Sequence, residues 1–336
     1  MLSASSKSDL SAVILHHIVE GVEYASALQN GSQKSYPTLE GSDVHVHRDG
    51  NGTVTVSASG GWEGMSASVS LRNMLTKTGV IHEVSDVLLP RSFNLTIGKL
   101  ARAATASTMS TMLVRAGMEW VLNGTAPPED SPWADVGLSA AGWTLLCPTD
   151  DAFKGYNLTR LYEDPTRLQA IIGQHLIPLS KPHTLLLAQL DSFQANRPLL
   201  LDDAATYTTL ASMGSAYGDI VFRQSGEDEK GDPLYLVGIK NAKGTNGEKD
   251  WARVLSWGRT TTNGGVGGVI QIDSVLMPYQ PTWWLEYGAP IGVGGIGIAL
   301  IGLFFLGVRT LWRRDTTEAT YEPVGGFSNN DDDEEG

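Results

Sequence analysis

At 336 residues, the chain is long enough for two domains of ordinary size, and its 41% hydrophobic and 18% charged residues are typical of a globular protein. The formal net charge of −13 argues against a nucleic-acid-binding protein, because a phosphate backbone requires a basic surface. The single cysteine, Cys147, excludes an intrachain disulfide.

The N-terminal region joins a polar start to a short apolar segment. We expect residues 1–12 to be disordered or to form a broken helix, and Val13–Gly21 (VILHHIVEG) is apolar around His16 and His17. The region contains no apolar run of about 7–15 residues, which a secretory signal peptide requires. Two explanations stay open: the chain is a truncated gene product, or it is a tail-anchored protein whose N-terminal part is cytosolic.

Strand patterns dominate the next seventy or so residues. Val44–Val56 and Met65–Leu71 alternate apolar and polar residues, as half-buried strands do. Gly79–Pro90 (GVIHEVSDVLLP) starts with glycine, is rich in β-branched residues and ends in proline. This pattern predicts a β-strand with a firm stop.

A helical region and a short apolar strand follow. Apolar residues recur at helical spacing in Leu95–Leu122, and we expect Gly117 to divide this region into two helices. Thr144–Cys147 is predicted to be a strand that runs into Pro-Thr-Asp-Asp, where Thr149 or Asp150 would cap a helix. Within this strand, Cys147 is expected to be a buried thiol that packs as a small hydrophobe.

The apolar histidine segment occurs a second time. Ile171–Leu179 (IIGQHLIPL) matches Val13–Gly21, and His175 takes the place of His17. Beyond it, charge clusters in Gln224–Asp250 indicate a solvated hairpin or a partner-binding loop. Leu185–Leu190 and Leu199–Leu201 are apolar runs, and predicted strands are Asp219–Arg223 and Leu234–Ile239.

Gly267–Pro278 (GGVIQIDSVLMP) repeats Gly79–Pro90. Without gaps, the two segments share the first glycine and the last proline. Between these ends they agree in type at Val84/Ile272, Val87/Val275, Leu88/Leu276 and Leu89/Met277. A repeated strand at this separation predicts two copies of one domain.

Ala289–Val308 has the features of a transmembrane helix. It contains no charged residue and has about the 20-residue length that a bilayer core of ~30 Å requires. A buried helix of a soluble protein is the alternative, which the glycines and the charged stop disfavour. Gly288 and Gly292 form a GxxxG pair that would suit a homodimer through this helix. Interfacial aromatics and arginines flank the segment: Trp283, Trp284, Tyr287, Arg309, Trp312, Arg313 and Arg314.

The flanking charges predict the orientation. Arginines after the helix place the C-terminus in the cytosol and the bulk of the chain outside it. We therefore expect a single-pass membrane protein with its main part at the cell surface or in a vacuolar or endosomal lumen. N-glycosylation sequons occur only before the helix, at Asn30, Asn51, Asn94, Asn123 and Asn157.

The tail carries two short patterns. Tyr321–Val324 (YEPV) fits a tyrosine-x-x-hydrophobic sorting signal, with Tyr321 and Val324 as its two defining residues, and Asp331–Glu335 is an acidic cluster. The alternative is a disordered acidic tail that is solvated and carries no signal.

The sequence does not argue for an enzyme. Helix capping explains the adjacent Asp150 and Asp151, and the pair His45-x-His47, like His16-His17, offers two ligands without the third that a zinc site needs. G-x-S-x-G, P-loop and C-x-x-C patterns are absent. We therefore expect no catalytic residue, no cofactor and no metal.

We interpret His17 and His175 as structural residues. Each is followed by aliphatic residues inside an apolar segment. We expect both histidines to make buried hydrogen bonds that tie the central segment to the Pro-Thr-Asp turn.

Taken together, these motifs resemble the fasciclin-like (FAS1) domain family. Its hallmarks are a first box like T-x-F-A-P-T-D-x-A-F, a central histidine followed by aliphatics, and a closing box like G-V-I-H-V-I-D-x-V-L-x-P. Thr144–Phe153 (TLLCPTDDAF) resembles the first box, with Cys147 where the family usually has alanine. His175 resembles the central histidine. Gly267–Pro278, with Asp273 and Pro278 among its motif residues, is similar to the closing box, with Ile270 where the family has its second histidine.

An earlier copy matches only from His17 to Pro90, with His82 at the closing-box histidine, and lacks the first box. The resemblance implies an α+β fold of tandem FAS1 domains, each a β-sandwich or wedge flanked by helices, plus one C-terminal transmembrane helix. We expect a first, partial copy (1–91), a second, complete copy (92–280), a juxtamembrane segment (281–288), a transmembrane helix (289–308) and an acidic cytosolic tail (309–336). The native gene product is then expected to extend upstream and to include a signal peptide. The expected core of the second copy contains Leu145, Phe153, Ile172, Leu176, Ile272 and Val275.

The resemblance also implies a function. FAS1 domains tethered to a membrane would bind other surface molecules, matrix or glycans. In animal members an Asp-Ile pair before the closing box is linked to integrin binding, whereas the matching place here is Arg72–Leu75 (RNML), without the aspartate. The alternative is a vacuolar or lysosomal membrane glycoprotein that acts in trafficking or membrane fusion. Expected partners are the lipid bilayer and a protein or glycan; nucleic acid is not among them.

Overall fold

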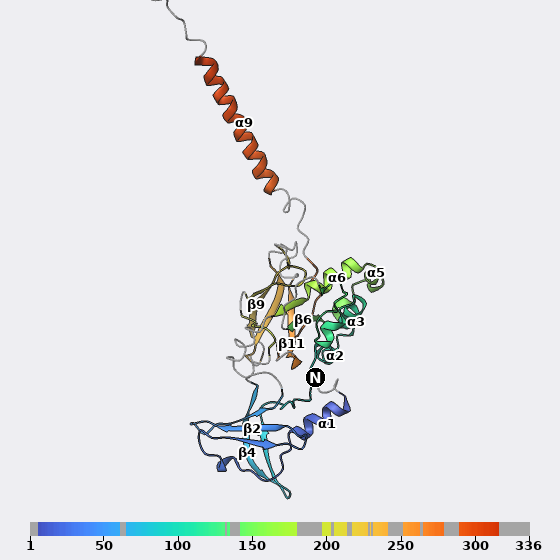
Figure 1. The fold of residues 1–336 in the computed structure, drawn as a ribbon, viewed down its shortest axis with the longest axis vertical. Coiled ribbons are helices and arrows are strands. Elements are labelled where there is room, and N and C mark those ends of the chain that lie inside the picture. Colours follow the sequence, from blue (N-terminus) through green and yellow to red (C-terminus); the bar gives the residue numbers. More distant parts are fainter. Residues whose placement is uncertain are drawn as a thin grey trace, which may run out of the picture. The chain divides into compact units, whose positions relative to one another are not determined.

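The computed structural model describes residues 6–60, 65–131, 133–134, 142–179, 197–202, 205–213, 217–227, 229, 231–240, 251–262, 265–278 and 289–315. The chain divides into two compact units, Met1–Tyr279 and Gln280–Gly336. The first unit contains both copies, and each copy has its own β-sheet (Figure 1). Helices and sheets are mixed along the chain, so the predicted α+β class is confirmed.

The first copy is a helix followed by a five-stranded antiparallel sheet. Helix α1 (Lys7–His16) leads through a short 3-10 helix, η2 (Ala25–Ala27), into strands that pair in chain order. This order places the last strand at one edge of the sheet, where it has one neighbour among the strands of the described residues. The strands are β1 (Gln33–Pro37), β2 (Asp43–Arg48), β3 (Val54–Ala58), β4 (Ser66–Leu75) and β5 (Val80–Val84).

Helix α1 corrects the prediction for residues 1–12, because it is continuous from Lys7 onward. Its start is fixed by a capping box: the Ser6 hydroxyl accepts a hydrogen bond from the Asp9 amide, and the Asp9 carboxylate accepts one from the Ser6 amide. The polar composition concealed this signal. A polar start with Ser-x-x-Asp is a helix N-terminus as well as a candidate for disorder.

The second copy begins with three short helices where two were predicted. The chain breaks at Gly117, which has a φ of 71°, as expected, and again near Thr105, which has a φ of 52°. A threonine in the left-handed region gives no warning in the sequence, since this conformation is usual only for glycine, asparagine and aspartate. The helices are α2 (Ile97–Ala103), α3 (Ser107–Arg115) and α4 (Glu119–Asn123), and after the first box come η4 (Asp150–Phe153), α5 (Leu158–Tyr162) and α6 (Pro165–Gln174).

A seven-stranded mixed sheet completes this copy, with strand order β7-β6-β12-β11-β10-β9-β8. The first-box strand β6 and the closing strand β12 lie side by side and are parallel, so Val269 faces Leu145 in the register. The other pairs are antiparallel. The strands are β6 (Gly142–Pro148), β7 (Leu176–Leu179), β8 (Thr206–Tyr207), β9 (Ile220–Glu227), β10 (Pro233–Ile239), β11 (Ala252–Arg259) and β12 (Gly267–Ile272).

Two hydrophobic cores lie on the two faces of this sheet. One joins helices α2 to α6 to β6 and β12 through Leu145, Ile172, Leu176 and Val269; we call it the helix-side core. In Figure 1 the helices gather beside the sheet that carries β6 and β11. The expected core residues Leu145, Phe153, Ile172, Leu176 and Ile272 are buried, and Val275 is partly buried against the helix-side core.

The other core combines strand residues, such as Ile177 of β7 and Ile220 of β9, with buried leucines of the connecting segments, among them Leu199 and Leu201. Strands β7 and β8 lie six steps apart in the strand order, which would be about 29 Å in a flat sheet. Shortly after β8, however, the Leu210 amide donates a 2.8 Å hydrogen bond to the Leu176 carbonyl oxygen of β7. The sheet therefore curves so that its two ends approach each other.

Most predicted strands are present, and two regions differ. Val44–Val56 is divided into β2 and β3 by a turn, and β11 was not predicted at all. Leu199–Leu201 contains buried leucines outside any strand. Leu185–Leu190 and residues 241–250 lie outside the described residues.

The second unit contains one long helix, α9 (Ala289–Asp315). Within it, Gly294–Trp312 is long and apolar enough to cross a membrane. The helix contains the predicted segment Ala289–Val308 and continues through Arg309 and Trp312.

Candidate functional site

The central histidine of the second copy joins helix α6 to the closing segment. Its Nδ1 lies 2.8 Å from the carbonyl oxygen of Ile171, and its Nε2 accepts a hydrogen bond of 3.0 Å from the amide of Leu276. Because Nε2 is an acceptor here, the neutral ring carries its proton on Nδ1. Complete burial lowers the pKa of His175 to about 4. His175 therefore makes its structural hydrogen bonds as a neutral ring, and this ring is a poor base.

His17 repeats this arrangement in the first copy. Its Nδ1 lies 2.7 Å from the carbonyl oxygen of Val13, and its Nε2 accepts a 3.0 Å bond from the amide of Leu88. Both histidines therefore fasten their helix to the closing segment, which corrects the expectation that they bind the Pro-Thr-Asp turn. His17 is also exposed, whereas a buried bond was expected. The turn is held by another bond, from the Thr149 amide to the Ile272 carbonyl oxygen.

Asp150 of the first box binds the start of helix α3, whereas it was predicted to cap the helix that follows the box. Thr149 is at the N-cap position of η4, but its side chain makes no capping hydrogen bond. Asp150 accepts hydrogen bonds from the amides of Ser107 and Thr108 at the start of α3, and from the Ser107 hydroxyl. Partial burial opposes the charge, but these bonds hold the pKa of Asp150 below its usual value. This carboxylate therefore fastens α3 to the first-box turn.

The closing-box residues Asp273 and Pro278 have structural surroundings. The Asp273 carboxylate accepts hydrogen bonds from the Arg253 amide at 2.8 Å and the Ser274 hydroxyl at 3.0 Å, and the Asp273 amide donates to the Arg253 carbonyl oxygen. It thereby ties the end of β12 to the start of β11. Pro278 is half-buried at the end of the described closing segment.

The surface residues predicted for modification and sorting divide into two groups. The sequon residues Asn30, Asn51, Asn94, Asn123 and Asn157 are all exposed. Asn157 also caps α5 through its Oδ1, which leaves the Nδ2 atom that a glycan would use. Tyr321 and Val324 lie outside the described residues, as does Gly288 of the GxxxG pair.

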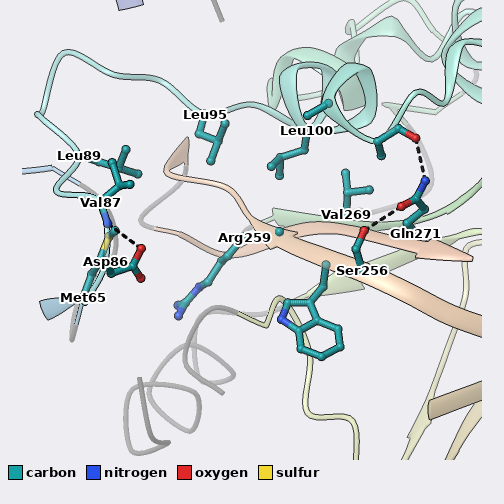
Figure 2. A pocket seen from close by; sticks show the side chains of 14 residues that line it. Met65, Asp86, Val87, Leu89, Leu95, Leu100, Ser256, Arg259, Val269 and Gln271 are labelled. Carbon is teal, nitrogen blue, oxygen red and sulfur yellow. Dashed lines mark hydrogen bonds between the residues drawn. The ribbon is translucent and has the colours of Figure 1, made fainter. Parts of the chain in front are cut away.

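A cavity of about 410 Å³ opens between the closing region of the first copy and the helices and sheet of the second (Figure 2). Leu89, Leu95, Leu100 and Val269 give it apolar walls, and Arg259 contributes a cation. Burial lowers the pKa of Arg259 to about 10, so the guanidinium stays charged at neutral pH. The remaining lining residues are Met65, Asp86, Val87, Ala103, Ala104, Ser256, Trp257, Gly258 and Gln271.

The polar groups of the cavity are engaged in holding the fold. Gln271 accepts a 2.8 Å bond from the Ser256 hydroxyl and donates a 2.8 Å bond to the Ala104 carbonyl oxygen, so it joins β11, β12 and the end of α2. The Arg259 Nε donates to the Gly265 carbonyl oxygen at 2.6 Å. The cavity could hold a small molecule with an apolar body and one polar end. Its described lining has no serine, cysteine or threonine beside a histidine, which nucleophilic catalysis would need.

Two further buried groups could not be found from the sequence. Arg197 is enclosed by the rings of Tyr235 and Trp257, with its guanidinium carbon 4.9 and 4.8 Å from their centroids. His16 is buried beside Ser42 and Glu40, and burial lowers its pKa. The Ser42 hydroxyl and the Glu40 carboxylate both approach His16 at Nδ1, at 3.1 and 3.6 Å. In a catalytic relay the hydroxyl and the carboxylate contact opposite ring nitrogens of the histidine. Here both contact Nδ1, so we assign this cluster a structural role.

The cysteine and the histidine pair that the sequence singled out both lie on strands. Cys147 is fully buried in β6, and burial raises the pKa of its thiol to about 12, which agrees with an inert core residue. His45 and His47 lie two residues apart on β2, so they are on the same face of the sheet. Across the described part of the chain, no group of three or more His, Cys, Asp or Glu side chains is arranged to hold a metal ion.

Comparison with known proteins adds the following. A sequence model of the fasciclin domain matches residues 1–90 and 104–278. Curated proteins give no match. Among solved structures, the chain is similar to a FAS1 domain pair from the insect cell adhesion molecule fasciclin I, with 16% identity, a TM-score of 0.31 and coverage of 82% of this chain and 81% of that one.

Proposed function

Because the chain belongs to the fasciclin domain family, as its three motifs predicted, we propose that it is a membrane-tethered binding protein whose two copies contact protein or glycan partners outside the cytosol. One observation carries the proposal: two fasciclin copies in one unit are followed by a helix that is long and apolar enough to span a bilayer. Fasciclin domains are commonly related to adhesion.

The positions of charges and sequons support the orientation. Arg309 follows the apolar part of α9 and belongs on the cytosolic side. The five sequon asparagines are exposed on the first unit, where a glycosyltransferase in the lumen would meet them. The structural roles of His175, Asp150 and Cys147 support a binding module over an enzyme.

Glycosidase treatment of the full chain in its own cell type tests the orientation. We expect faster migration on a gel after treatment, and loss of this shift when all sequons are removed. Asn30, Asn51, Asn94 and Asn123 are replaced by glutamine. For the fifth sequon Thr159→Ala is preferable, because it leaves the Asn157 cap of α5 intact. A membrane-bound chain that shows no shift would contradict the proposal and favour cytosolic domains.

A second candidate, a glycoprotein of the vacuolar or lysosomal membrane acting in trafficking or fusion, rests on Tyr321, Val324 and the acidic cluster. A Tyr321→Ala variant distinguishes the two locations. Movement of the tagged chain from an internal membrane to the cell surface would favour the second candidate. A wild-type chain already at the surface, unchanged by the substitution, would favour the first. Homodimerisation through α9, suggested by Gly288 and Gly292, remains a proposal that crosslinking of a Gly292→Leu variant would test.

A further inference from the structure

A buried histidine holds the end of helix α1 to the turn between β1 and β2. His16 is 0% exposed, and its Nδ1 lies 3.1 Å from the hydroxyl oxygen of Ser42 and 3.3 Å from that of Thr38. Both hydroxyls donate their protons elsewhere, Ser42 to the Glu40 carboxylate and Thr38 to the Ser42 carbonyl oxygen. The proton between the ring and the hydroxyls therefore belongs to Nδ1. Neutral His16 is thus the donor in this cluster, and its Nε2 carries a lone pair.

The second ring nitrogen of His16 decides what acid does to this cluster. Nε2 is buried and has no hydrogen-bond partner among the described residues. Protonation would turn it into a buried N–H donor without an acceptor, which costs more free energy than a buried lone pair. Burial lowers the pKa of His16 accordingly, although the charge of Glu40 opposes the shift. Acid therefore weakens the attachment of α1 to the turn.

The groups that face His16 come from three segments. The turn contributes the Glu40 carboxylate, 3.6 Å from Nδ1, and helix α1 contributes His17, which opposes a positive charge on His16. The linker between the copies contributes Ser92, whose hydroxyl donates a 2.7 Å bond to Glu40. Hydrogen bonds from Ser42 and Ser92 hold the pKa of Glu40 below its usual value. In this cluster the histidines, and not Glu40, therefore change charge at mildly acidic pH.

The second copy contains the same turn without a titratable group in the place of His16. One backbone hydrogen bond marks the equivalent turns, from the amide of Leu39 to the carbonyl oxygen of Ile18 and from that of Leu210 to that of Leu176. Gln174 corresponds to His16 and is 1% exposed, and its side-chain amide donates a 2.7 Å bond to the Gly218 carbonyl oxygen. Ala211 corresponds to Glu40. The two copies therefore differ in whether this attachment can respond to pH.

We propose that His16, Thr38, Glu40 and Ser42 form an acid-sensitive latch, which fastens α1 to the turn at neutral pH and opens when His16 takes up a proton. Opening also releases Glu40 from its place beside the linker. The corresponding attachment at Gln174 stays closed over the same pH range. The latch does not rest on the proposed function, and an acidified lumen is the setting in which it would act. Described residues enclose His16 completely, so its contacts do not depend on what precedes Met1.

Hydrogen exchange of the full chain in detergent, followed by mass spectrometry from pH 7.5 to pH 5, tests the latch. This range stays above the pKa of about 4 of His175. After correction for the pH dependence of exchange itself, we expect residues 38–42 to lose protection about tenfold or more relative to residues 209–213. Each pH unit between the usual 6.5 and the lowered pKa of His16 favours the open state about tenfold, because only the open state then takes up the proton.

Two reciprocal variants identify the residue responsible. His16→Gln gives the first copy the residue of the second, and it should remove most of the pH dependence of residues 38–42. Gln174→His should make residues 209–213 lose protection on acidification. His47→Gln is the matched control, since His47 is an exposed histidine on β2, and it leaves the wild-type profile unchanged. Each reciprocal variant is informative alone, so misfolding of one leaves the other to decide.

Three results would overturn the latch. One is equal protection of residues 38–42 at both ends of the pH range in the wild-type chain. Another is the same pH dependence in wild type and His16→Gln. The third comes from NMR of the histidine rings, with the His16 signal assigned by its absence in His16→Gln. Titration of that signal at or above pH 6.5 would mean that acid strengthens the contact with Glu40.

Discussion

The two closing strands of the chain share a motif and differ in their surroundings. Strand β12 is buried at Gly267, Gly268, Val269, Ile270 and Ile272, while no residue of β5 is buried. The first copy keeps a core on its own sheet, with Val44, Val54 and Val69 buried, and its described residues form no second core like the helix-side core of the second copy. The comparison teaches that one packed face of the sheet is enough for the closing strand to form, as β5 does in the first copy. Burial of that strand, as seen for β12, requires packing on the second face as well.

The largest expected contrast in stability is between Gly267 and Gly79, the glycines that begin the two closing segments. Gly267 has a φ of 97°, and a Cβ there would lie 2.1 Å from the carbonyl oxygen of Trp143 in β6. Gly79 meets nothing within 4 Å. We expect Gly267→Ala to reduce the free energy of unfolding by more than about 3 kcal/mol and Gly79→Ala to change it by about 0.5 kcal/mol or less.

Urea unfolding of the full chain in detergent measures both variants. The Trp120 and Trp143 rings lie 5.3 Å apart in the second copy and report its unfolding by fluorescence. Far-UV circular dichroism reports both copies. Equal losses for the two alanine variants would show that β5 also has a close neighbour on its outer side.

The second-largest contrast is expected between His175 and His17, in the free energy of unfolding that each alanine substitution removes. His175→Ala leaves the buried Leu276 amide without a partner and creates a cavity, so we expect a loss of about 3 kcal/mol. His17→Ala breaks the same bond where water can replace it, and about 1 kcal/mol or less is expected. The same unfolding experiments provide the readout. A large loss for His17→Ala would mean that the first copy is more tightly packed around α1 than its exposed residues indicate.

Acidification should destabilise the second copy through His175. Its folded pKa of about 4 lies below the usual 6.5, so the unfolded state takes up the proton first as the pH falls. The stability is fully present above about pH 6.5 and is lost toward pH 4, by at most about 3 kcal/mol. His175→Gln should flatten this part of the pH profile of Trp fluorescence unfolding. An unchanged profile would contradict the neutral, buried ring.

The smallest expected effect concerns an ion pair between the copies. The Asp9 carboxylate of α1 lies 2.9 Å from the Lys99 ammonium of α2, and this hydrogen bond lowers the pKa of Asp9 although burial opposes the shift. Both side chains are partly exposed, so we expect a coupling free energy of about 0.5 kcal/mol in a double-mutant cycle of Asp9→Asn and Lys99→Met. The exposed pair Lys34–Glu23 is the control and should couple more weakly.

The sequence predicted what depends on local pattern and repetition. The motifs identified the family, the strands β6 and β12, and six residues of the second copy's core, of which five are buried and Val275 is partly buried. What it missed depends on contacts distant in sequence. Asp150 caps a helix that starts at Ser107, and Arg197 is buried because two aromatic rings from different strands enclose it. No pattern around either residue identifies those partners.

Other omissions have local causes. Strand β11 (ARVLSWGR) alternates too weakly to be recognised, and α1 was missed because its capping box resembles a disordered polar start. The cavity could not be predicted, because its walls come from segments as distant as Met65 and Gln271.

Native-state hydrogen exchange of the full chain in detergent tests the central claim most directly. The account predicts that β12 amides exchange only through global unfolding, whereas the outward amides of β5 exchange many times faster than those bonded to β4. Equal, strong protection of β5 and β12 would contradict the account, because the outer edge of β5 would then be covered.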